Sequence, residues 1–162
     1  MSKVYLILGS NVGNKNQIIE DALHDLEILV GSIIQKSSVY STEPWGMESN
    51  EYFLNRVVVL ESDLLPMDIL DHCLKIETKY GRIRKNSSLY ENRTLDIDIL
   101  FIDQLVINEK NLQIPHPRIS ERRFVLEPLA EICSDFVHPQ LHKTIALLFK
   151  ESNDNSNVDR VL

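Results

Sequence analysis

Residues 93–103, RTLDIDILFID, decide the fold we expect, because they read as one β-strand with two different faces. Side chains alternate between the two faces of a strand. One face is wholly apolar and carries Leu95, Ile97, Ile99 and Phe101. Asp96 and Asp98 stand side by side at the start of the other face. The apolar face predicts a strand anchored in the core, and the two carboxylates mark a candidate site at one end of it.

The segments before this strand alternate between strand and helix patterns. Short β-rich runs at 3–9, 33–41 and 53–62 predict three strands. Apolar residues at helical spacing follow the first run up to Gly31, and a second helical pattern begins at Pro66 and ends at Gly81. The order is therefore β-α-β-β-α-β. It predicts an α+β, ferredoxin-like βαββαβ sandwich, with an antiparallel four-stranded sheet and helices packed on one face.

The rest of the chain predicts C-terminal additions to this sandwich. We expect a short strand at 105–107, a helical segment at 120–132 interrupted by Pro128, and a last helix at about 143–151. The polar tail at 152–162 is predicted to be mobile. No Gly- or Ser-rich linker divides the sequence, so residues 1–162 are expected to form a single domain.

Composition narrows the class of protein. Among the 162 residues, 24 acids outnumber 17 Lys and Arg, giving a net charge of −7. This balance argues against a nucleic-acid partner, which needs a broad basic face, but leaves room for one polyphosphate held by a few arginines. The longest early apolar run, 4–8, is too short for a signal peptide or a membrane span. Cys73 and Cys133 have no metal-like spacing, so we expect a reduced, cytoplasmic, monomeric protein without a membrane partner.

Asp96 and Asp98 are candidate metal ligands. Residues i and i+2 of a strand point the same way with Cα atoms about 6.5–7 Å apart, so both carboxylates can reach a shared cation or two bridged cations. All-oxygen ligands favour Mg²⁺ or Mn²⁺, and Mg²⁺ commonly combines few carboxylates with phosphate oxygens. The alternative is a solvated acidic face, which is what a bare Asp-x-Asp more often represents.

A cluster of basic residues leads into the same strand. Arg82, Arg84, Lys85 and Arg93 bracket the polar stretch RIRKNSSLYENR at 82–93. Arginines beside metal-binding acids are typical of phosphoryl transfer, where catalysis consists mainly of positioning and charge neutralisation. The alternative, a solvated basic loop paired with nearby glutamates, carries similar weight from these residues alone.

A further group of residues would suit a flat heterocycle. His116 lies between two prolines and precedes a segment that opens with arginines. Aromatic side chains can stack on a ring, and an amide can bind its edge. The residues concerned are Trp45, Phe53, Asn55 and Phe124. The alternative, that the two phenylalanines simply fill the core, is stronger without further information.

Several blocks together resemble a known family. They are LGSN (8–11), STEPWG (41–46), FLNRVV (53–58), IETKYGRIR (76–84), RTLDIDILF (93–101) and IPHPRISERRFVLEPLAEI (114–132). In this order and spacing they resemble 6-hydroxymethyl-7,8-dihydropterin pyrophosphokinase, an enzyme of folate biosynthesis. The resemblance spans residues 3–150. It implies the βαββαβ fold, and transfer of the terminal pyrophosphate of ATP to the pterin hydroxymethyl group with release of AMP.

The resemblance also implies a role for each matching residue. Two Mg²⁺ ions, with Mn²⁺ as an alternative, would bind Asp96 and Asp98, and Arg82 and Arg93 would close over the phosphates of the co-substrate ATP. The residues expected to bind ATP are Glu77, Arg84, His116 and Arg122. Those expected to bind the pterin are Thr42, Pro44, Trp45, Phe53, Asn55 and Phe124.

One departure and two rival functions accompany this interpretation. Glu91-Asn92 stands where the family usually has Gly-Pro, which affects how Arg93 would reach the phosphates. The rival enzyme is a kinase that moves a single phosphoryl group. The rival from another class is a non-catalytic binding module, since the βαββαβ order also serves RNA-recognition and small-molecule regulatory domains.

Overall fold

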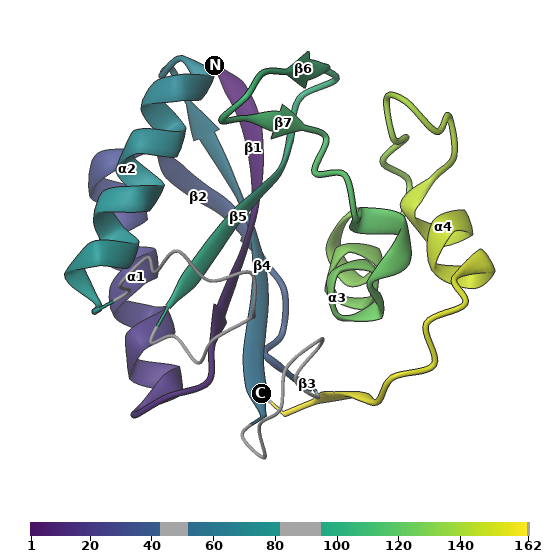
Figure 1. Ribbon diagram of the computed structural model, residues 1–162, viewed down its shortest axis with the longest axis horizontal. Coiled ribbons are helices and arrows are strands. Elements are labelled where there is room, and N and C mark those ends of the chain that lie inside the picture. Colours follow the sequence, from purple (N-terminus) through teal and green to yellow (C-terminus); the bar gives the residue numbers. More distant parts are fainter. Residues whose placement is uncertain (43–51, 82–94, 162) are drawn as a thin grey trace.

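The computed structural model describes residues 1–42, 52–81 and 95–161, and its centre is one antiparallel sheet (Figure 1). The described strands are ordered β5-β1-β4-β3-β8, and β2 also pairs with β4. Their bounds are β1 (Ser2–Ser10), β2 (Ser32–Lys36), β3 (Tyr40–Thr42), β4 (Phe53–Ser62), β5 (Asp96–Ile102) and β8 (Val158–Arg160). β1 therefore lies between β4 and β5, although these strands are far apart in sequence.

The first six predicted elements occur in the predicted order. Helix α1 (Lys15–Leu29) connects β1 to β2, and α2 (Pro66–Lys79) connects β4 to β5. Pro66 occupies the first turn of α2, and Gly81 follows its end with a φ of 87° that glycine adopts without strain. The side chain of Asn14 caps α1 by accepting a hydrogen bond from the Gln17 amide. The α+β sandwich with an antiparallel sheet is confirmed.

Helices cover both faces of the sheet: the two helices of the βαββαβ core lie on one face, as predicted, and the C-terminal helices cover the other (Figure 1). Figure 1 shows α1 and α2 on one side, with α3 (Arg123–Cys133) and α4 (Ile145–Glu151) on the other. Two separate hydrophobic clusters fill the two interfaces. The reason lies in strands such as β4, where residues 57–60 are all buried. A strand that is apolar on both faces must be covered on both.

A β-bulge changes the direction of the side chains along β5. The register between β1 and β5 shifts between Tyr5 and Leu6, opposite the stretch from Ile99 to Phe101. As a result, Ile97 and Ile99 pack with α1 and α2, whereas Phe101 packs on the α3 side. Strict alternation had placed Phe101 on the same face as Ile97, which is wrong because the extra residue of the bulge reverses the order.

The predicted strand at 33–41 is divided into β2 and β3. The interruption centres on Ser37, whose hydroxyl accepts a hydrogen bond from the Val57 amide at 3.0 Å. Ser38 then turns toward α3, where its amide and hydroxyl both donate to the carboxylate of Glu131. The side-chain contacts therefore replace part of the regular pairing with β4.

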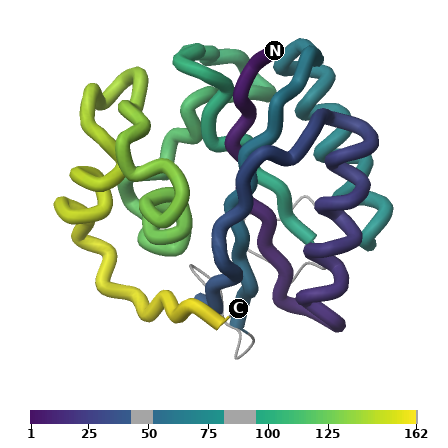
Figure 2. Tube along the Cα trace, turned by 180° about the vertical axis from the view of Figure 1, so that it is seen from behind, coloured from purple at the N-terminus to yellow at the C-terminus, as the bar shows by residue number. Residues whose placement is uncertain are grey.

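The C-terminal additions lie mainly on the second face. A 3-10 turn, η1 (Ile119–Glu121), precedes α3, and the hairpin of β6 (Ile107–Asn108) and β7 (Gln113–Ile114) follows β5. Pro128 lies inside α3 without ending it. The polar segment 152–161, for which mobility was predicted, returns to the sheet as β8 (Figure 2).

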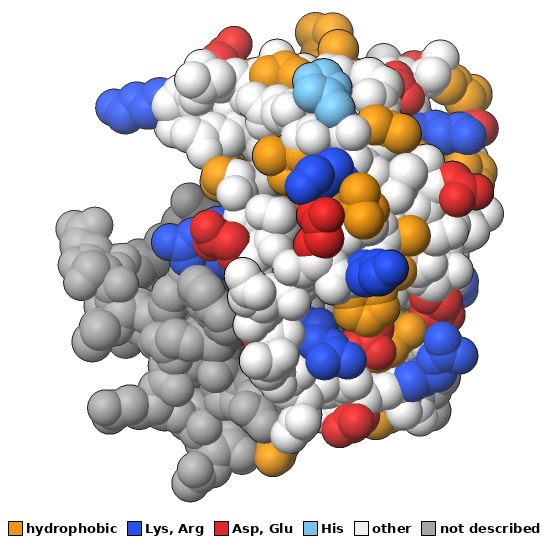
Figure 3. All heavy atoms as spheres, turned by 90° about the vertical axis from the view of Figure 1, so that its right-hand side faces the viewer, with side chains coloured by type: hydrophobic (Ala, Val, Ile, Leu, Met, Phe, Trp, Pro, Cys, Tyr) orange, Lys and Arg blue, Asp and Glu red, His pale blue; other side chains and the backbone are white. Residues whose placement is uncertain are grey.

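The surface over α3 and α4 carries mixed charge. Figure 3 shows Lys and Arg side chains interspersed with Asp and Glu on this face, with scattered hydrophobic side chains between them. Among the described residues, no helix has the length and apolar character needed to cross a bilayer.

Both cysteines are free thiols in apolar surroundings. Cys73 is buried in the cluster beneath α1 and α2, and Cys133 is half-buried at the end of α3. Burial raises the pKa of each thiol to about 12, so neither forms a reactive thiolate near neutral pH. They act as small hydrophobic residues, as predicted.

Candidate active site

Asp96 and Asp98 occupy the first half of β5 and point toward the α3 side of the sheet. Both are half-buried, whereas Ile97 between them is buried on the opposite face. Asp96 lies opposite Gly9 of β1, and Asp98 lies opposite Ile7, which belongs to the cluster under α3. The pair therefore shares one face of a strand fixed on its other face by the core, as the sequence predicted.

A second group of polar residues lies two strands away. Asn55 of β4 is buried, and its amide nitrogen donates to the hydroxyl of Thr42 on β3 at 2.7 Å. Gly9 separates Asn55 from Asp96, since it lies opposite both of them in the sheet. With neighbouring strands about 4.8 Å apart, the Cα atoms of Asn55 and Asp96 are about 10 Å apart. One small molecule can therefore contact both groups.

Gly9 makes room between these two groups. A Cβ atom at this position would lie 2.8 Å from Oδ1 of Asn55 and 3.8 Å from Cδ1 of Phe53. The absent side chain leaves the floor between Asn55 and Asp96 open. Phe53 lies on the same face of β4 as Asn55, and it is half-buried at the edge of this space.

Residues 116–124 form the wall above the carboxylates. The His116 amide donates to the Leu100 carbonyl of β5 at 3.0 Å, which fixes this segment beside the sheet. Asp96 and Arg122 both act electrostatically on the imidazole of His116, so the three side chains lie near one another. The Arg122 guanidinium lies 5.5 Å from the ring centre of Phe124. Positive charge thus faces the side of the site that holds the carboxylates.

The imidazole of His116 is neutral in this setting. Burial, together with the positive charge of Arg122, lowers its pKa to about 4, although Asp96 acts in the opposite direction. Its Nδ1 accepts a hydrogen bond from the Arg118 amide at 3.2 Å, which assigns the proton to Nε2. His116 can therefore donate one hydrogen bond from Nε2 without carrying charge.

We expect the ring of His116 to remain unprotonated as the pH falls from 8 to 5, because its pKa lies near 4. Its ring resonances in NMR spectra should titrate below pH 5, and a His116→Gln variant identifies them by their loss. Since the pKa of His116 in the folded protein lies below the ordinary histidine value of 6.5, the folding stability that His116 contributes is complete above pH 6.5 and declines as the pH falls toward 4. A midpoint near 6.5 in the folded protein would contradict this prediction.

Glu77 connects α2 to the strand that carries the carboxylates. It is buried, and its Oε1 accepts a hydrogen bond from the Ile97 amide at 2.9 Å. The Ile97 amide therefore points away from β1, toward the outer edge of β5. In an antiparallel strand every second residue has this orientation, so the backbone of Ile99 faces the same edge.

A groove of about 310 Å³ opens along this outer edge. It lies between α2, β5 and the segment around β7. Its lining residues include Leu70, Leu74, Glu77, Asp98, Leu112 and His116. Apolar walls beside an edge strand suit a flat base with a hydrogen-bonding edge. Asp98 lines the groove and belongs to the carboxylate pair, so the groove reaches the carboxylates.

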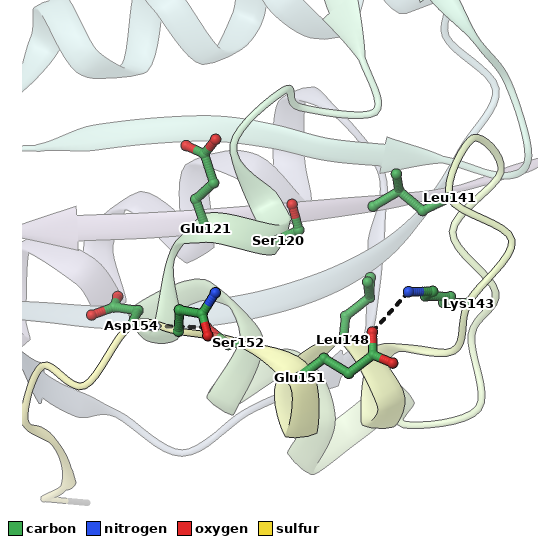
Figure 4. Close-up of a pocket in the computed structure, with 9 residues that line it drawn as sticks. Ser120, Glu121, Leu141, Lys143, Leu148, Glu151, Ser152 and Asp154 are labelled. Atoms are coloured by element: carbon green, nitrogen blue, oxygen red, sulfur yellow. Dashed lines mark hydrogen bonds and ion pairs between the residues drawn. The ribbon is translucent and has the colours of Figure 1, made fainter.

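A larger hollow of about 710 Å³ lies elsewhere, among η1, α4 and the segment that follows α4 (Figure 4). None of the predicted site residues lines it. Its size therefore does not identify it as the site.

The predicted site residues fall into two classes. The structure brings together Asp96, Asp98, Glu77, His116, Arg122, Phe124, Asn55, Thr42 and Phe53 around one end of the sheet. Pro44, Trp45, Arg82, Arg84 and Arg93 lie outside the described residues, as do Glu91 and Asn92.

Sequence reasoning missed two features of this site. Gly9 was quoted only as part of LGSN, yet its small size opens the space beside Asn55. The groove lining was missed as well, because Leu70 and Leu74 follow an ordinary helical apolar pattern. A glycine at the end of an otherwise fully buried strand was the available signal for the first of these.

The carboxylates of Asp96 and Asp98 fit a hard divalent cation that is also bound by phosphate oxygens of a substrate. Within the described part of the chain, no group of three or more His, Cys, Asp and Glu side chains could hold a metal alone. Asp96 and Asp98 supply oxygen ligands from one face of β5, with space above them. Two carboxylates combined with phosphate oxygens make a set that Mg²⁺ accepts.

Comparison with known proteins identifies the family. A family model described as 7,8-dihydro-6-hydroxymethylpterin-pyrophosphokinase (HPPK) matches residues 5–134. The chain belongs to the HPPK family. This confirms the predicted function at the level of the family: pyrophosphate transfer to hydroxymethyldihydropterin in folate biosynthesis, with ATP as co-substrate.

Curated HPPK relatives cover most of the chain. A 2-amino-4-hydroxy-6-hydroxymethyldihydropteridine pyrophosphokinase of Porphyromonas gingivalis is 42% identical over 142 residues, which is 86% of this chain and 96% of the relative. A protein of the same name from Aquifex aeolicus is 39% identical over 145 residues, covering 90% of this chain and 89% of the relative.

Solved structures show the same fold. The HPPK-DHPS protein of Plasmodium falciparum matches with a TM-score of 0.76 at 20% identity, over 93% of this chain. This chain spans 44% of that longer protein. Another HPPK-DHPS structure, solved in complex with substrates, matches with a TM-score of 0.77 at 17% identity. This chain spans 43% of that protein.

Proposed function

We propose that this chain is a Mg²⁺-dependent pyrophosphokinase that transfers the terminal pyrophosphate of ATP to the hydroxymethyl oxygen of 6-hydroxymethyl-7,8-dihydropterin and releases AMP. The observation that carries the proposal is the position of Asp96 and Asp98. They lie between the Asn55–Thr42 pair on one side and the groove along β5 on the other. Two substrates bound on these two sides would meet at the carboxylates.

ATP would occupy the groove at the outer edge of β5. Its base would lie against Leu70 and Leu74, with its edge on the strand backbone near Ile99. Its phosphates would then reach Asp98, His116 and Arg122. Glu77 holds the Ile97 amide in place and lines the same groove, so we assign it a positioning role toward the nucleotide.

The pterin would lie over Gly9, with its ring between Phe53 and Phe124 and its amide edge on Asn55. Thr42 accepts a hydrogen bond from the Asn55 side chain and so fixes the amide in one orientation. We assign Pro44 and Trp45, which follow Thr42 in the chain, to the same pterin site, and Arg82, Arg84 and Arg93 to the ATP phosphates, from sequence alone.

Asp96 and Asp98 would hold two Mg²⁺ ions, with Mn²⁺ as the alternative. Bound there, the metal supplies charge neutralisation at the phosphates. The hydroxymethyl oxygen would attack the β-phosphorus, and the bond from the β-phosphorus to the bridging α-β oxygen would break. AMP would leave with that oxygen, and the hydroxyl proton would pass to water. The protein positions the two substrates in line and donates hydrogen bonds from neutral His116 and from Arg122 to the phosphate oxygens.

We further propose that the chain acts as a single-domain, cytoplasmic monomer with no nucleic-acid or membrane partner. The support is the net charge of −7, the mixed charge in Figure 3 and the two free thiols.

The decisive experiment identifies the nucleotide product. With ATP, Mg²⁺ and the hydroxymethyldihydropterin, we expect AMP to form in equal amount to the pterin diphosphate, as measured by anion-exchange chromatography. Formation of ADP would indicate a kinase that moves one phosphoryl group. Absence of turnover by a folded protein that still binds the pterin would indicate a binding module.

A further inference from the structure

We propose that residues 152–161 position the pterin half of the site by fixing its two walls, with Asp154 and Arg160 as the positioning residues. The α3 wall is the start of α3, which carries Phe124, and the β3 wall is strand β3, which carries Thr42. The inference rests on the proposed assignment of the pterin to Phe124, Thr42 and Asn55. This segment lies outside residues 5–134, which the family model matches. It therefore adds a structural element to the site that the family assignment does not supply.

The segment crosses the second face of the molecule. Figures 1 and 2 both show it leaving α4, passing the start of α3 and reaching the sheet beside β3. Figure 4 shows its beginning, where Ser152 and Asp154 line the larger hollow. The two ends of this path touch α3 and β3, which are the elements that carry Phe124 and Thr42.

The first contact is at the start of α3. Arg122 is the N-cap residue of this helix and makes no side-chain capping hydrogen bond. The Arg123 amide instead donates to Oδ2 of Asp154 at 2.8 Å. A carboxylate at this position satisfies one of the free amides of a first helical turn and interacts favourably with the helix dipole. Asp154 thus fixes the backbone between Arg122 and Phe124.

The Asp154 carboxylate is itself held in place. Its Oδ1 accepts hydrogen bonds from both the amide and the hydroxyl of Ser156. The Asp154 amide donates to the Ser152 hydroxyl at 3.2 Å. The capping carboxylate therefore has a defined orientation, set by residues of the same segment.

The second contact is the pairing of β8 with β3. Val158 lies opposite Thr42 and Arg160 opposite Tyr40, and the Val161 amide donates to the Val39 carbonyl at 2.9 Å. β3 has three residues, so without β8 it would be a short edge strand held by β4 alone. Pairing on both sides restricts the motion of Thr42, which orients Asn55.

Arg160 extends this contact to α3. Its guanidinium donates to the Tyr40 hydroxyl at 3.3 Å and lies 3.7 Å from Oε2 of Glu131. The Tyr40 hydroxyl donates to the same carboxylate oxygen at 2.6 Å. The network links β8, β3 and α3, which places the β3 wall and the α3 wall in a fixed relation.

The consequence concerns pterin affinity rather than chemistry. The apparent Kd of a ligand rises as the fraction of the protein in the binding-competent state falls. Loss of either contact lets one wall move away from the geometry that fits the pterin. The groove for the base of ATP lies on the outer edge of β5 and shares no lining residue with the 152–161 segment. The Arg160 variant should therefore leave nucleotide affinity unchanged. The Asp154 variant should lower nucleotide affinity less than pterin affinity, because Arg122 also lies beside the backbone that Asp154 fixes.

The test compares Asp154→Ala and Arg160→Ala with Lys143→Ala in the full chain. Lys143 forms a 2.8 Å ion pair with Glu151 nearby but contacts neither wall, so it controls for loss of a surface interaction. Calorimetry measures the Kd of the pterin, and separately that of an ATP analogue with a methylene group between the α- and β-phosphorus. We expect each Ala variant to weaken pterin binding about fivefold, and the control to leave it unchanged.

Conservative variants separate positioning from general stability. Asp154→Asn keeps an acceptor oxygen and Arg160→Lys keeps a positive charge, so both should recover most of the pterin affinity. An unchanged pterin Kd in both Ala variants would overturn the inference. So would an equal loss of pterin and nucleotide affinity accompanied by a lower Tm. Failure of the unaltered chain to bind the pterin would instead remove the proposed function, and the inference with it.

Discussion

Replacing Asp98 or Asp96 by asparagine should lower turnover by on the order of 10³-fold, because either change removes a charged oxygen ligand from the point where the phosphates would bind. Asparagine preserves the size of the side chain, and β5 is fixed on its other face by Ile97 and Ile99. Pterin affinity should stay within about twofold of the original, since we place the pterin mainly on the Asn55–Thr42 pair, two strands away. Steady-state kinetics at saturating Mg²⁺ and calorimetry with the pterin provide the two measurements.

Asp159→Asn is the matched control for these variants. Asp159 is also a strand carboxylate, but it is exposed on β8 and lies opposite Ser41. Its replacement should leave turnover unchanged. Thermal unfolding of the Asp96 and Asp98 variants without metal shows whether the sheet remains intact around each substitution. Full activity of either site variant would show that the metal assignment is wrong.

Gly9→Ala should weaken pterin binding by about ten- to a hundredfold, which corresponds to the usual cost of overpacking a tight site. The new Cβ would lie 2.8 Å from Oδ1 of Asn55 and would displace the amide that Thr42 orients. It would also occupy part of the floor on which we place the pterin ring. The binding of the ATP analogue should change little, because Gly9 does not line the groove along β5.

A graded series makes the Gly9 prediction sharper. Gly9→Val adds more volume at the same point and should weaken pterin binding further than Gly9→Ala. Thermal unfolding of both variants would show whether the sheet remains intact around the substitution. Equal pterin affinity in the original chain and in Gly9→Ala would contradict the position that we assign to the ring.

Local patterns predicted the elements of the βαββαβ core well. Pro66 and Gly81 bounded α2, and the alternation around Asp96 and Asp98 placed both carboxylates on one face. These features depend on residues close in sequence, where spacing and backbone preference act directly. The roles of Glu77 and Arg122 near the carboxylates came from the family resemblance. The place of His116, between the aspartate strand and the segment that opens with Arg122, indicated on its own that it could reach the same site.

The errors concern contacts between distant segments. The face of Phe101 depends on a bulge that arises where β5 pairs with β1, and no local pattern in RTLDIDILFID contains it. The C-terminal helices were predicted but the face on which they pack was not, although the run VVVL at 57–60 is typical of a strand buried on both sides. The pairing of β8 with β3 was missed because a polar segment gave no strand signal of its own.

The central position of β1 has a consequence for synthesis on the ribosome. β1 leaves the ribosome long before its partner β5, which ends at Ile102, paired with Val4. At typical rates of about 5–20 residues per second, β1 would wait roughly 5–20 s before its second partner exists. During this time one edge of the apolar run at 4–8 has no native partner, and such edges pair readily with other chains. The nascent chain is therefore most exposed to aggregation before the segment that carries Asp96 and Asp98 has been made.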